Sequence, residues 1–415
     1  FFTKYISGKA GNPNAYVFLE NTNLPAFIFM AVVVALFLGL SISAEEIIKD
    51  RKHLKRESFL GLSRNSYLHS KISLLFLISA IQMITFVLIG NFILEIKGMT
   101  FHYWLILFTT SCFANMLGLN ISSALNSVIT IYILIPFILV PELLFSGVIV
   151  RYDKLHKSIA NPEYVPVIGD IMTSRWAYEA LMVHQFGSNK FQKQFFDVQK
   201  EISDASYMKD YFITELQNEI VTCERTLAAK DNAAELKASL KLLSWGIEKL
   251  ENTTGISFAS LGELNPKSVS MELLDETNSY LLHAKDVFVS RRIDASRRND
   301  ERYYELVNSR GGKEAFYEFR QKYYNRTISD LVQNRDGIEN IVRVDNKLIQ
   351  LKDPIYKNPD SGVGRAHFYA SHKRFGNLQI ATFWFNFVFI WFTTLLLYLA
   401  LRFNLLRKLI DSVGK

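Results

Sequence analysis

Four long runs without a charged side chain constrain the fold of this chain more than any other feature of its sequence. An α-helix rises about 1.5 Å per residue and the hydrocarbon core of a bilayer is about 30 Å thick, so about 20 apolar residues cross it once. Residues 25–44, 72–94 and 375–401 each have this length. Residues 98–141 are about twice as long, and we expect two crossings with a break at 120–127, where Asn and Ser cluster. The sequence therefore predicts five membrane-spanning helices.

The composition agrees with a membrane protein. Of the 415 residues, 49% are hydrophobic and 13% aromatic, and the mean hydropathy is +0.10. A net charge of +7 fits either a nucleic-acid-binding protein or a polytopic membrane protein with a basic cytoplasmic side. The two cysteines, Cys112 in an apolar run and Cys223 in a polar one, do not indicate a disulfide framework.

The positions of the basic residues decide between these two classes. Seven lysines and arginines lie in the connection 49–71, and five crossings place that connection on the same side as the basic C-terminal tail. The opposite short segments carry only three lysines, so the basic side is expected to be cytoplasmic. Residues 153–374 are then extracytoplasmic, and no nucleic acid partner is needed to explain the charge.

The basic connection has a helical part of its own. Residues 46–61 have the pattern of an amphipathic helix at the cytoplasmic surface, and Leu54, Phe59 and Leu60 of this helix, with Leu62 just after it, are expected to dip into the membrane interface. The simplest interpretation is a juxtamembrane anchor.

The polar region 188–372 is too long for a loop, and we predict that it is a mainly helical extracytoplasmic domain. It separates a membrane part, residues 1–187, from a last membrane span with its cytoplasmic tail, residues 373–415. Leucines and isoleucines repeat at helical spacing over 236–250, and a similar stripe runs over 212–223, which suits an antiparallel coiled-coil-like hairpin. A second helical block is expected over 271–308. A further helix carries Phe316, Phe319, Tyr323 and Leu331, and an irregular return to the membrane follows it.

No catalytic motif is recognisable in this sequence. The histidines of the polar region are solitary and the cysteines unpaired, so neither a metal site nor catalytic residues are predicted. The stretch 310–314, RGGKE, lacks the first glycine and the hydroxyl residue of a phosphate-binding loop. If ATP is used, ATP and Mg²⁺ are bound by a domain outside this segment. The chain begins without methionine and is interpreted as part of a longer polypeptide. Two glycosylation tripeptides, at Asn252 and Asn325, decide nothing by themselves.

Several short motifs resemble one family. Acidic residues end the first run, an Arg-Glu pair and the stretch SYLHSK at 66–71 follow, FSG stands at 145–147, and SRWAYEAL stands at 174–181. Their order and spacing resemble the transmembrane (ABC-2 type permease) domain of G-subfamily ATP-binding cassette transporters over 20–187 and 375–410. The resemblance implies an all-α polytopic membrane protein with a six-helix ABC-2 type transmembrane domain. The five predicted spans would be helices two to six, with an enlarged outer loop domain inserted at 189–370.

The resemblance also implies functional residues. The helix at 46–61 would be a coupling helix that rests on the nucleotide-binding domain, and Arg56 and Glu57 would pair with that domain or with the end of helix two. The implied coupling residues are Glu45, Glu46, Arg56, Glu57, Tyr67 and Lys71. Helices two and five of two copies would line the substrate cavity with mostly apolar side chains, namely Phe29, Phe37, Phe137, Val140, Glu142 and Phe145. Such a lining suits hydrophobic or amphipathic cargo, including lipid-like molecules.

Together these features predict the permease of an ATP-driven exporter in the plasma membrane, most simply a bacterial inner membrane. It would work with a second copy of itself or a homologous half-transporter and with a nucleotide-binding domain on the same longer chain. Membrane lipid and an extracytoplasmic protein are further expected partners. The alternative is a membrane-anchored binding or scaffold protein whose outer helical domain docks a partner. An ion-coupled transporter is disfavoured because acids and bases are scarce within the predicted spans.

Overall fold

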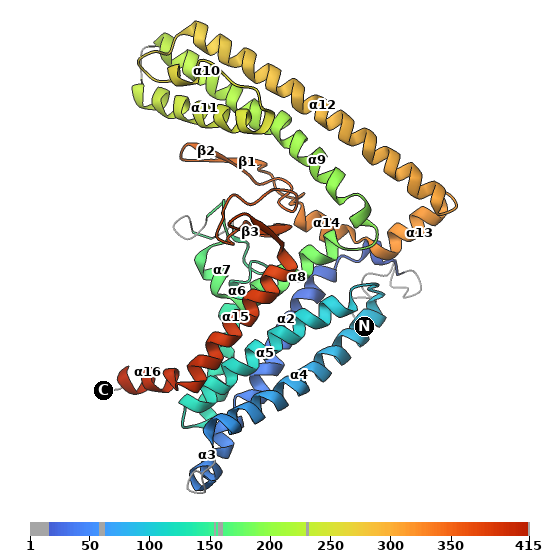
Figure 1. Ribbon diagram of the computed structural model, residues 1–415, viewed down its shortest axis with the longest axis vertical. Coiled ribbons are helices and arrows are strands. Elements are labelled where there is room, and N and C mark those ends of the chain that lie inside the picture. Colours follow the sequence, from blue (N-terminus) through green and yellow to red (C-terminus); the bar gives the residue numbers. More distant parts are fainter. Residues whose placement is uncertain (1–15, 58–62, 153–154, 157–160, 230–231, 414–415) are drawn as a thin grey trace. The chain divides into compact units, whose positions relative to one another are not determined.

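A computed structural model describes residues 16–57, 63–152, 155–156, 161–229 and 232–413, and it is mainly helical (Figure 1). The chain forms two compact units. Among the described residues, the first unit covers 16–191, 318–329 and 359–413, and the second covers 192–317 and 330–358. The division lies near the expected domain limits, but 318–329 and 359–372 also belong to the first unit.

The first unit contains the apolar helices. Helices α2, α4, α5 and α15 are long and apolar enough to cross a membrane, and α6 is a shorter apolar helix of 17 residues. The break expected at 120–127 is confirmed, because α5 ends at Ala124 and α6 begins at Val128. The helices are α2 (Leu24–Ser43), α3 (Glu46–Glu57), α4 (Arg64–Leu94), α5 (Thr100–Ala124), α6 (Val128–Leu144), α7 (Val167–Ile171), α8 (Thr173–Gly187), α15 (Thr382–Arg402) and α16 (Leu405–Val413), with a short 3-10 turn at Phe18–Glu20.

Helix α5 lies at the centre of this bundle and contacts α2, α4, α8 and α15. Its crossing with α2 is close because glycine stands at the contact: a Cβ at Gly118 would lie 2.0 Å from the Ser43 hydroxyl oxygen. Polar side chains add interhelical hydrogen bonds. Asn115 donates to the hydroxyl of Ser79 in α4 at 2.8 Å, and Asn120 donates to the carbonyl of Leu397 in α15 at 2.9 Å. These bonds satisfy polar groups that lipid would leave unpaired.

The second unit is built on helices α9 (Phe196–Tyr207), α10 (Ile213–Ala229), α11 (Ala233–Thr254) and α12 (Met271–Ser309), with a π-helical turn at Met208–Phe212 between α9 and α10. The two predicted apolar stripes are buried in one core, where α10 and α11 contact each other. Gly246 of α11 allows the closest approach, because a Cβ there would lie 2.5 Å from the Leu216 side chain. The 271–308 helix prediction is confirmed by α12.

Two expectations for the residues after α12 are wrong. The helix expected around Phe316–Leu331 is two helices, α13 (Lys313–Tyr323) and α14 (Arg326–Val332). The irregular segment predicted over 352–368 is confirmed, and it lies between two antiparallel hairpins that were not predicted, β1 (Ile341–Val344) with β2 (Lys347–Gln350), and β3 (His372–Phe375) with β4 (Leu378–Ala381). The last spanning helix therefore begins at Thr382 rather than at Phe375, because the uncharged residues before it pair as strands. Each hairpin turns over two residues, with positive φ at Asp345 and at Gly376.

Candidate functional site

A group of half-buried charged side chains, which we call the α3 cluster, joins α3 to the start of α4. It consists of Glu46 and Asp50 from α3 and Tyr67 and Lys71 from α4. The Lys71 ammonium lies 2.8 Å from a carboxylate oxygen of Glu46 and 2.8 Å from one of Asp50. The Tyr67 hydroxyl donates to the same Asp50 oxygen at 2.9 Å. Each helix contributes two residues four positions apart, so both pairs lie on facing sides.

Helix α3 is also fixed to the end of α5. The hydroxyl oxygen of Ser122 accepts hydrogen bonds from the backbone amides of Ile47 and Ile48, at 3.1 and 3.0 Å. The Arg51 guanidinium donates to the carbonyl of Leu125 at 2.7 Å and to those of Ser122 and Ser123 at 3.4 and 3.3 Å. These contacts satisfy amides that open α3 and carbonyls that close α5. One short helix is thus bound to two membrane helices.

The structure brings together three of the six residues expected at the coupling surface, Glu46, Tyr67 and Lys71. Glu45 is buried and pairs with Lys49 one turn along the chain. Glu45 and Glu46, which follow α2, therefore bind lysines of α3 and α4, and the resemblance implied either these carboxylates or the nucleotide-binding domain as partners of Arg56 and Glu57. Arg56 is exposed on α3.

Other residues of the predicted cytoplasmic helix lie outside the described part of the structure. These are Phe59, Leu60 and Leu62 and the side chain of Glu57, so their expected roles stay predictions. Sequence reasoning missed Asp50, Arg51 and Ser122. The position of Asp50 four residues after Glu46 and that of Ser122 in the predicted helix break were the available signals.

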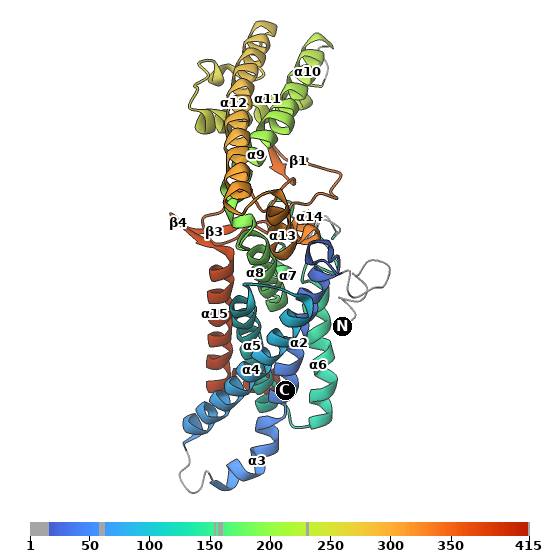
Figure 2. The same cartoon turned by 90° about the vertical axis from the view of Figure 1, so that its right-hand side faces the viewer.

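The residues expected to line a substrate cavity fall into two groups. Phe37 of α2 and Phe137 and Val140 of α6 are exposed, at 49%, 71% and 49% of their full surface. Phe29 instead is buried, edge-on to the ring of Tyr178 with ring centres 5.8 Å apart, and Phe145 is half-buried. Helices α2 and α6 contact each other (Figure 2), so the exposed group lies on two adjacent helices, and we refer to these three side chains as the apolar surface of α2 and α6.

Glu142, the one charged residue of that predicted lining, is buried and caps a helix. Its two carboxylate oxygens accept from the backbone amides of Thr173 at 3.2 Å and Ser174 at 2.8 Å, at the start of α8. The Ser174 hydroxyl donates back to the Glu142 carbonyl at 2.6 Å. A carboxylate is favourable at a helix N-terminus, which explains an acid at the end of an otherwise apolar helix.

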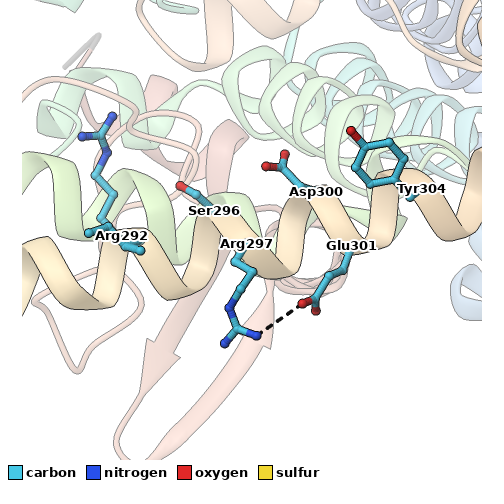
Figure 3. Close-up of a pocket in the computed structure, with 7 residues that line it drawn as sticks. Arg292, Ser296, Arg297, Asp300, Glu301 and Tyr304 are labelled. Atoms are coloured by element: carbon cyan, nitrogen blue, oxygen red, sulfur yellow. Dashed lines mark hydrogen bonds and ion pairs between the residues drawn. The ribbon is translucent and has the colours of Figure 1, made fainter.

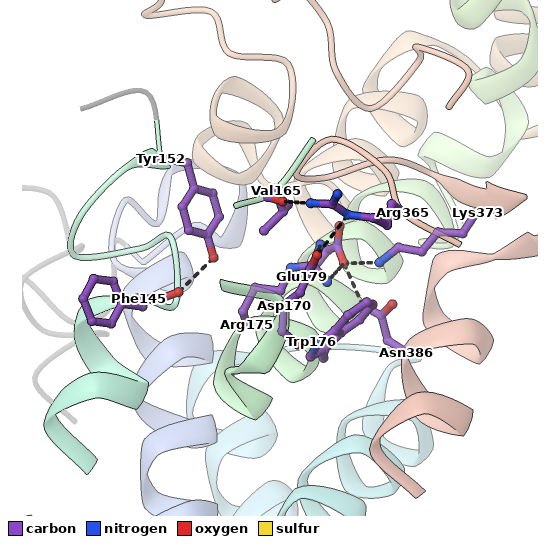
Figure 4. Close-up of polar contacts among 10 residues, drawn as sticks. All are labelled: Phe145, Tyr152, Val165, Asp170, Arg175, Trp176, Glu179, Arg365, Lys373 and Asn386. Carbon is purple, nitrogen blue, oxygen red and sulfur yellow. Dashed lines mark hydrogen bonds and ion pairs between the residues drawn. The ribbon is translucent and has the colours of Figure 1, made fainter. Parts of the chain in front are cut away.

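A second set of charges, the α8 cluster, lies at the end of the first unit away from α3 (Figure 1), and its contacts are drawn in Figure 4. It consists of Asp170 from α7, Arg175 and Glu179 from α8, Lys373 from β3 and Asn386 from α15. One carboxylate oxygen of Glu179 lies 2.8 Å from the Lys373 ammonium and 3.6 Å from the Arg175 guanidinium, and it accepts from the Asn386 amide at 2.9 Å. Arg175 also lies 3.6 Å from Asp170. The side chains of Glu179 and Lys373 are fully buried.

Aromatic and electrostatic contacts hold these charges in place. The Lys373 ammonium lies 4.1 Å and the Arg175 guanidinium 3.9 Å from the centre of the Trp176 ring. Burial and the neighbouring Arg175 lower the pKa of Lys373 to about 7, although Glu179 acts to raise it. Burial raises the pKa of Glu179, but Arg175 and Lys373 outweigh it and hold that pKa below its ordinary value. Glu179 is therefore ionised at neutral pH.

The sequence contained only part of the signal for the α8 cluster. Arg175 and Glu179 stand four residues apart in SRWAYEAL, which was quoted as a motif without a role for its charges. Lys373 and Asn386 carried no recognisable pattern, since they lie about 200 residues later in the chain and reach Glu179 only through tertiary packing.

The second unit carries a shallow depression of about 410 Å³ along α12 (Figure 3). Its lining comes from this one helix, and Arg297 and Glu301 form an exposed ion pair across it at 3.3 Å. Alternating charges of this kind are typical of a solvated helix face. Within the described residues, no group of three or more His, Cys, Asp or Glu side chains is placed to hold a metal ion.

The sequon at Asn325 is part of the fold. Its buried side-chain amide donates to the carbonyls of Phe18 and Asn21, both at 2.9 Å, and its oxygen caps the start of α14 through the amide of Ile328. This asparagine is therefore not accessible for glycosylation in the folded protein, whereas Asn252 is exposed at the end of α11.

Comparison with known proteins identifies one part of the chain. Residues 1–186 match the family described as ABC-2 type transporter. This match contains the α3 cluster, the exposed apolar surface of α2 and α6, and the α8 residues of the α8 cluster. No curated protein and no solved structure matches the chain.

Proposed function

We propose that this chain, in which residues 1–186 form an ABC-2 type transporter membrane domain, is the permease part of a G-subfamily-like ATP-driven exporter. It would move a hydrophobic or amphipathic, lipid-like substrate across the plasma membrane by alternating access. The nucleotide-binding domain, with ATP and Mg²⁺, lies on the same longer chain, and a second copy or a homologous half-transporter completes the cavity. The α3 cluster then faces the cytoplasm, and the region 153–374 lies on the outer side.

The attachment of α3 to two membrane helices is the observation that carries this proposal. Lys71 ties α3 to α4, and Ser122 with Arg51 ties it to α5, the central helix of the bundle. A helix whose first half is bound to two different membrane helices transmits a displacement to both of them instead of absorbing it. ATP-driven closure of the nucleotide-binding domains against α3 would therefore shift α4 and α5 together and open the membrane cavity to the other side.

The apolar surface of α2 and α6 supports the proposed class of substrate. The exposed side chains of this surface, Phe37, Phe137 and Val140, are aromatic or aliphatic. Glu142, the one charged residue of the predicted lining, is buried as a helix cap and adds no charge to the surface. Two such surfaces that face each other across a dimer would form an apolar cavity suited to amphipathic molecules.

The test compares ATP hydrolysis of the full-length protein, reconstituted in lipid, with that of a Lys71→Met variant. This substitution leaves Glu46 and Asp50 without their shared cation and loosens α3 from α4. We expect basal hydrolysis to persist and its stimulation by amphipathic cargo to be lost. Lys237→Met is the matched control, because it removes one exposed lysine from α11 of the second unit and leaves the α3 cluster unchanged.

Two results would contradict the proposal. Full cargo stimulation in Lys71→Met would mean that the α3 cluster does not couple hydrolysis to transport. A protein without ATP hydrolysis, and without a nucleotide-binding domain on its chain or bound to it, would instead be a membrane-anchored binding protein whose helical outer region docks an extracytoplasmic partner.

A further inference from the structure

The C-terminal helix α16 has a strict division into two faces. At 100° per residue, Leu405, Leu406, Leu409 and Ile410 share one arc of about 140°, and the charged Arg407, Lys408 and Asp411 occupy the other. Among the described residues, Leu406 is half-buried where α16 contacts α5, and the rest of the apolar arc is exposed: Leu405, Leu409 and Ile410 at 51%, 62% and 40%, and Phe403 before them at 55%. A helix with such a face needs an apolar surface to bind.

The position of α16 limits what that surface is. The spanning helix α15 ends at Arg402, and Asn404, with φ of 52°, reverses the local backbone so that α16 leaves the axis of α15 (Figure 1). A helix that starts three residues after a membrane span and turns away from its axis begins at the depth of the lipid headgroups. Its basic residues, together with Arg402, outnumber its single acid by three to one.

We propose that α16 is an interfacial helix that binds the anionic phospholipid surface at the α3 end of the first unit. The apolar arc enters the boundary between headgroups and acyl chains, and Arg402, Arg407 and Lys408 contact lipid phosphates. Anionic lipid suits this helix because the apolar face and the positive charges each add to its membrane affinity. This inference requires only that α15 spans a membrane, and it is independent of ATP-driven transport.

A contact at the corner before α16 connects it to α4, the helix that carries two residues of the α3 cluster. Arg64, at the start of α4, donates to the carbonyl of Leu401 at 3.3 Å and to the side-chain oxygen of Asn404, so it holds the corner between α15 and α16. Tyr67 and Lys71 of the α3 cluster follow Arg64 within two turns of α4. Lipid bound to α16 therefore also restrains the start of α4, and it is expected to stabilise the whole α3 end of the first unit.

The experiment places a nitroxide spin label at position 409 or 408 of the full chain, through Leu409→Cys or Lys408→Cys. The two buried native cysteines are replaced by alanine. The protein is reconstituted in phosphatidylcholine with or without phosphatidylglycerol. We expect the label at 409 to be accessible to oxygen and protected from a water-soluble nickel complex, and the label at 408 to show the reverse.

Charge reversal tests the lipid headgroup. Phosphatidylglycerol should raise the unfolding temperature of the native protein above its value in phosphatidylcholine, and the double variant Arg407→Glu, Lys408→Glu should lose this shift. The control Lys237→Glu, Lys241→Glu changes the charge equally on α11 of the second unit and should keep the shift.

Four results would overturn the proposal. Nickel access at both 408 and 409 would place α16 in water. A label at 409 shielded from both reagents, with dipolar broadening between labels, would assign the apolar face to a second copy of this chain. Shielding without broadening would assign it to a protein domain. Retention of the phosphatidylglycerol shift in Arg407→Glu, Lys408→Glu would remove the role of these charges.

Discussion

The buried ion pair of the α8 cluster is open to a direct energetic test. Lys373→Met keeps an unbranched side chain of similar length but removes the ammonium that lies 2.8 Å from Glu179. The Glu179 carboxylate then keeps the Asn386 amide at 2.9 Å and the more distant Arg175 guanidinium at 3.6 Å. Because Glu179 is fully buried, water cannot replace the lost ammonium without a change in the surrounding packing.

The expected cost follows from these distances. Removal of one partner from a buried ion pair costs about 3 to 5 kcal/mol, since the other charge stays buried without compensation. Arg175 still compensates Glu179 in part, so we expect the lower end, about 3 kcal/mol. The lost contact of Lys373 with the Trp176 ring adds little, because a methionine sulfur also contacts aromatic rings favourably. The double variant Glu179→Gln, Lys373→Met removes both charges of the pair, so its cost should fall below the sum of the single costs by about 2 kcal/mol.

The assay is reversible unfolding of the purified full-length protein in mixed micelles at pH 6, below the pKa of Lys373, so that the ion pair is formed. Unfolding is followed by tryptophan fluorescence, to which Trp176 contributes from within the α8 cluster. Arg297→Met is the control, because its exposed pair with Glu301 is expected to contribute about 1 kcal/mol or less. A Lys373→Met protein as stable as this control, or additive costs in the double variant, would refute the reasoning that the pair shares one buried electrostatic environment.

Three further predictions follow from the same contacts. The pKa of Lys373 is about 7 in the folded protein and has the ordinary lysine value of 10.5 in the unfolded chain, so the unfolded chain binds more protons between these two pH values. The free energy of unfolding should therefore rise from pH 7 to 9 in the native protein relative to Lys373→Met, and parallel pH profiles of the two proteins would contradict this. Gly118→Val should destabilise the bundle by more than about 2 kcal/mol in the same unfolding assay, because a Cβ there overlaps Ser43, whereas Gly262→Val, in open space, should change little. A cysteine at the exposed position Asn252 should react with an impermeant maleimide in intact cells, and one at the exposed position Lys408 should react in inverted vesicles. Labelling of both positions from the same side of the membrane would contradict the proposed orientation.

Much of the architecture could be predicted because it depends on local patterns. The lengths of uncharged runs located α2, α4 and α5, and the polar cluster between two apolar runs located the break before α6. Helical spacing of leucines identified the buried stripes of α10 and α11. The motifs up to SRWAYEAL led to the ABC-2 type membrane domain that the family match supports over residues 1–186. The period of apolar residues and the length of an uncharged run indicate burial along a single helix, so these features could be predicted without knowledge of tertiary contacts.

Contacts between distant segments were decided only by the tertiary structure. From the sequence, Glu142 was predicted to line a substrate cavity. Its role as the cap of α8 depends on tertiary packing, which brings the start of α8, 31 residues later in the chain, next to its carboxylate. Lys373 of β3 reaches Glu179 across 194 residues, and its partner strand β4 occupies residues whose lack of charge resembled the start of a membrane span. A buried charge is tolerated only where several segments supply its partners at once. No local pattern in the sequence encodes that convergence, because it depends on the packing of the whole unit.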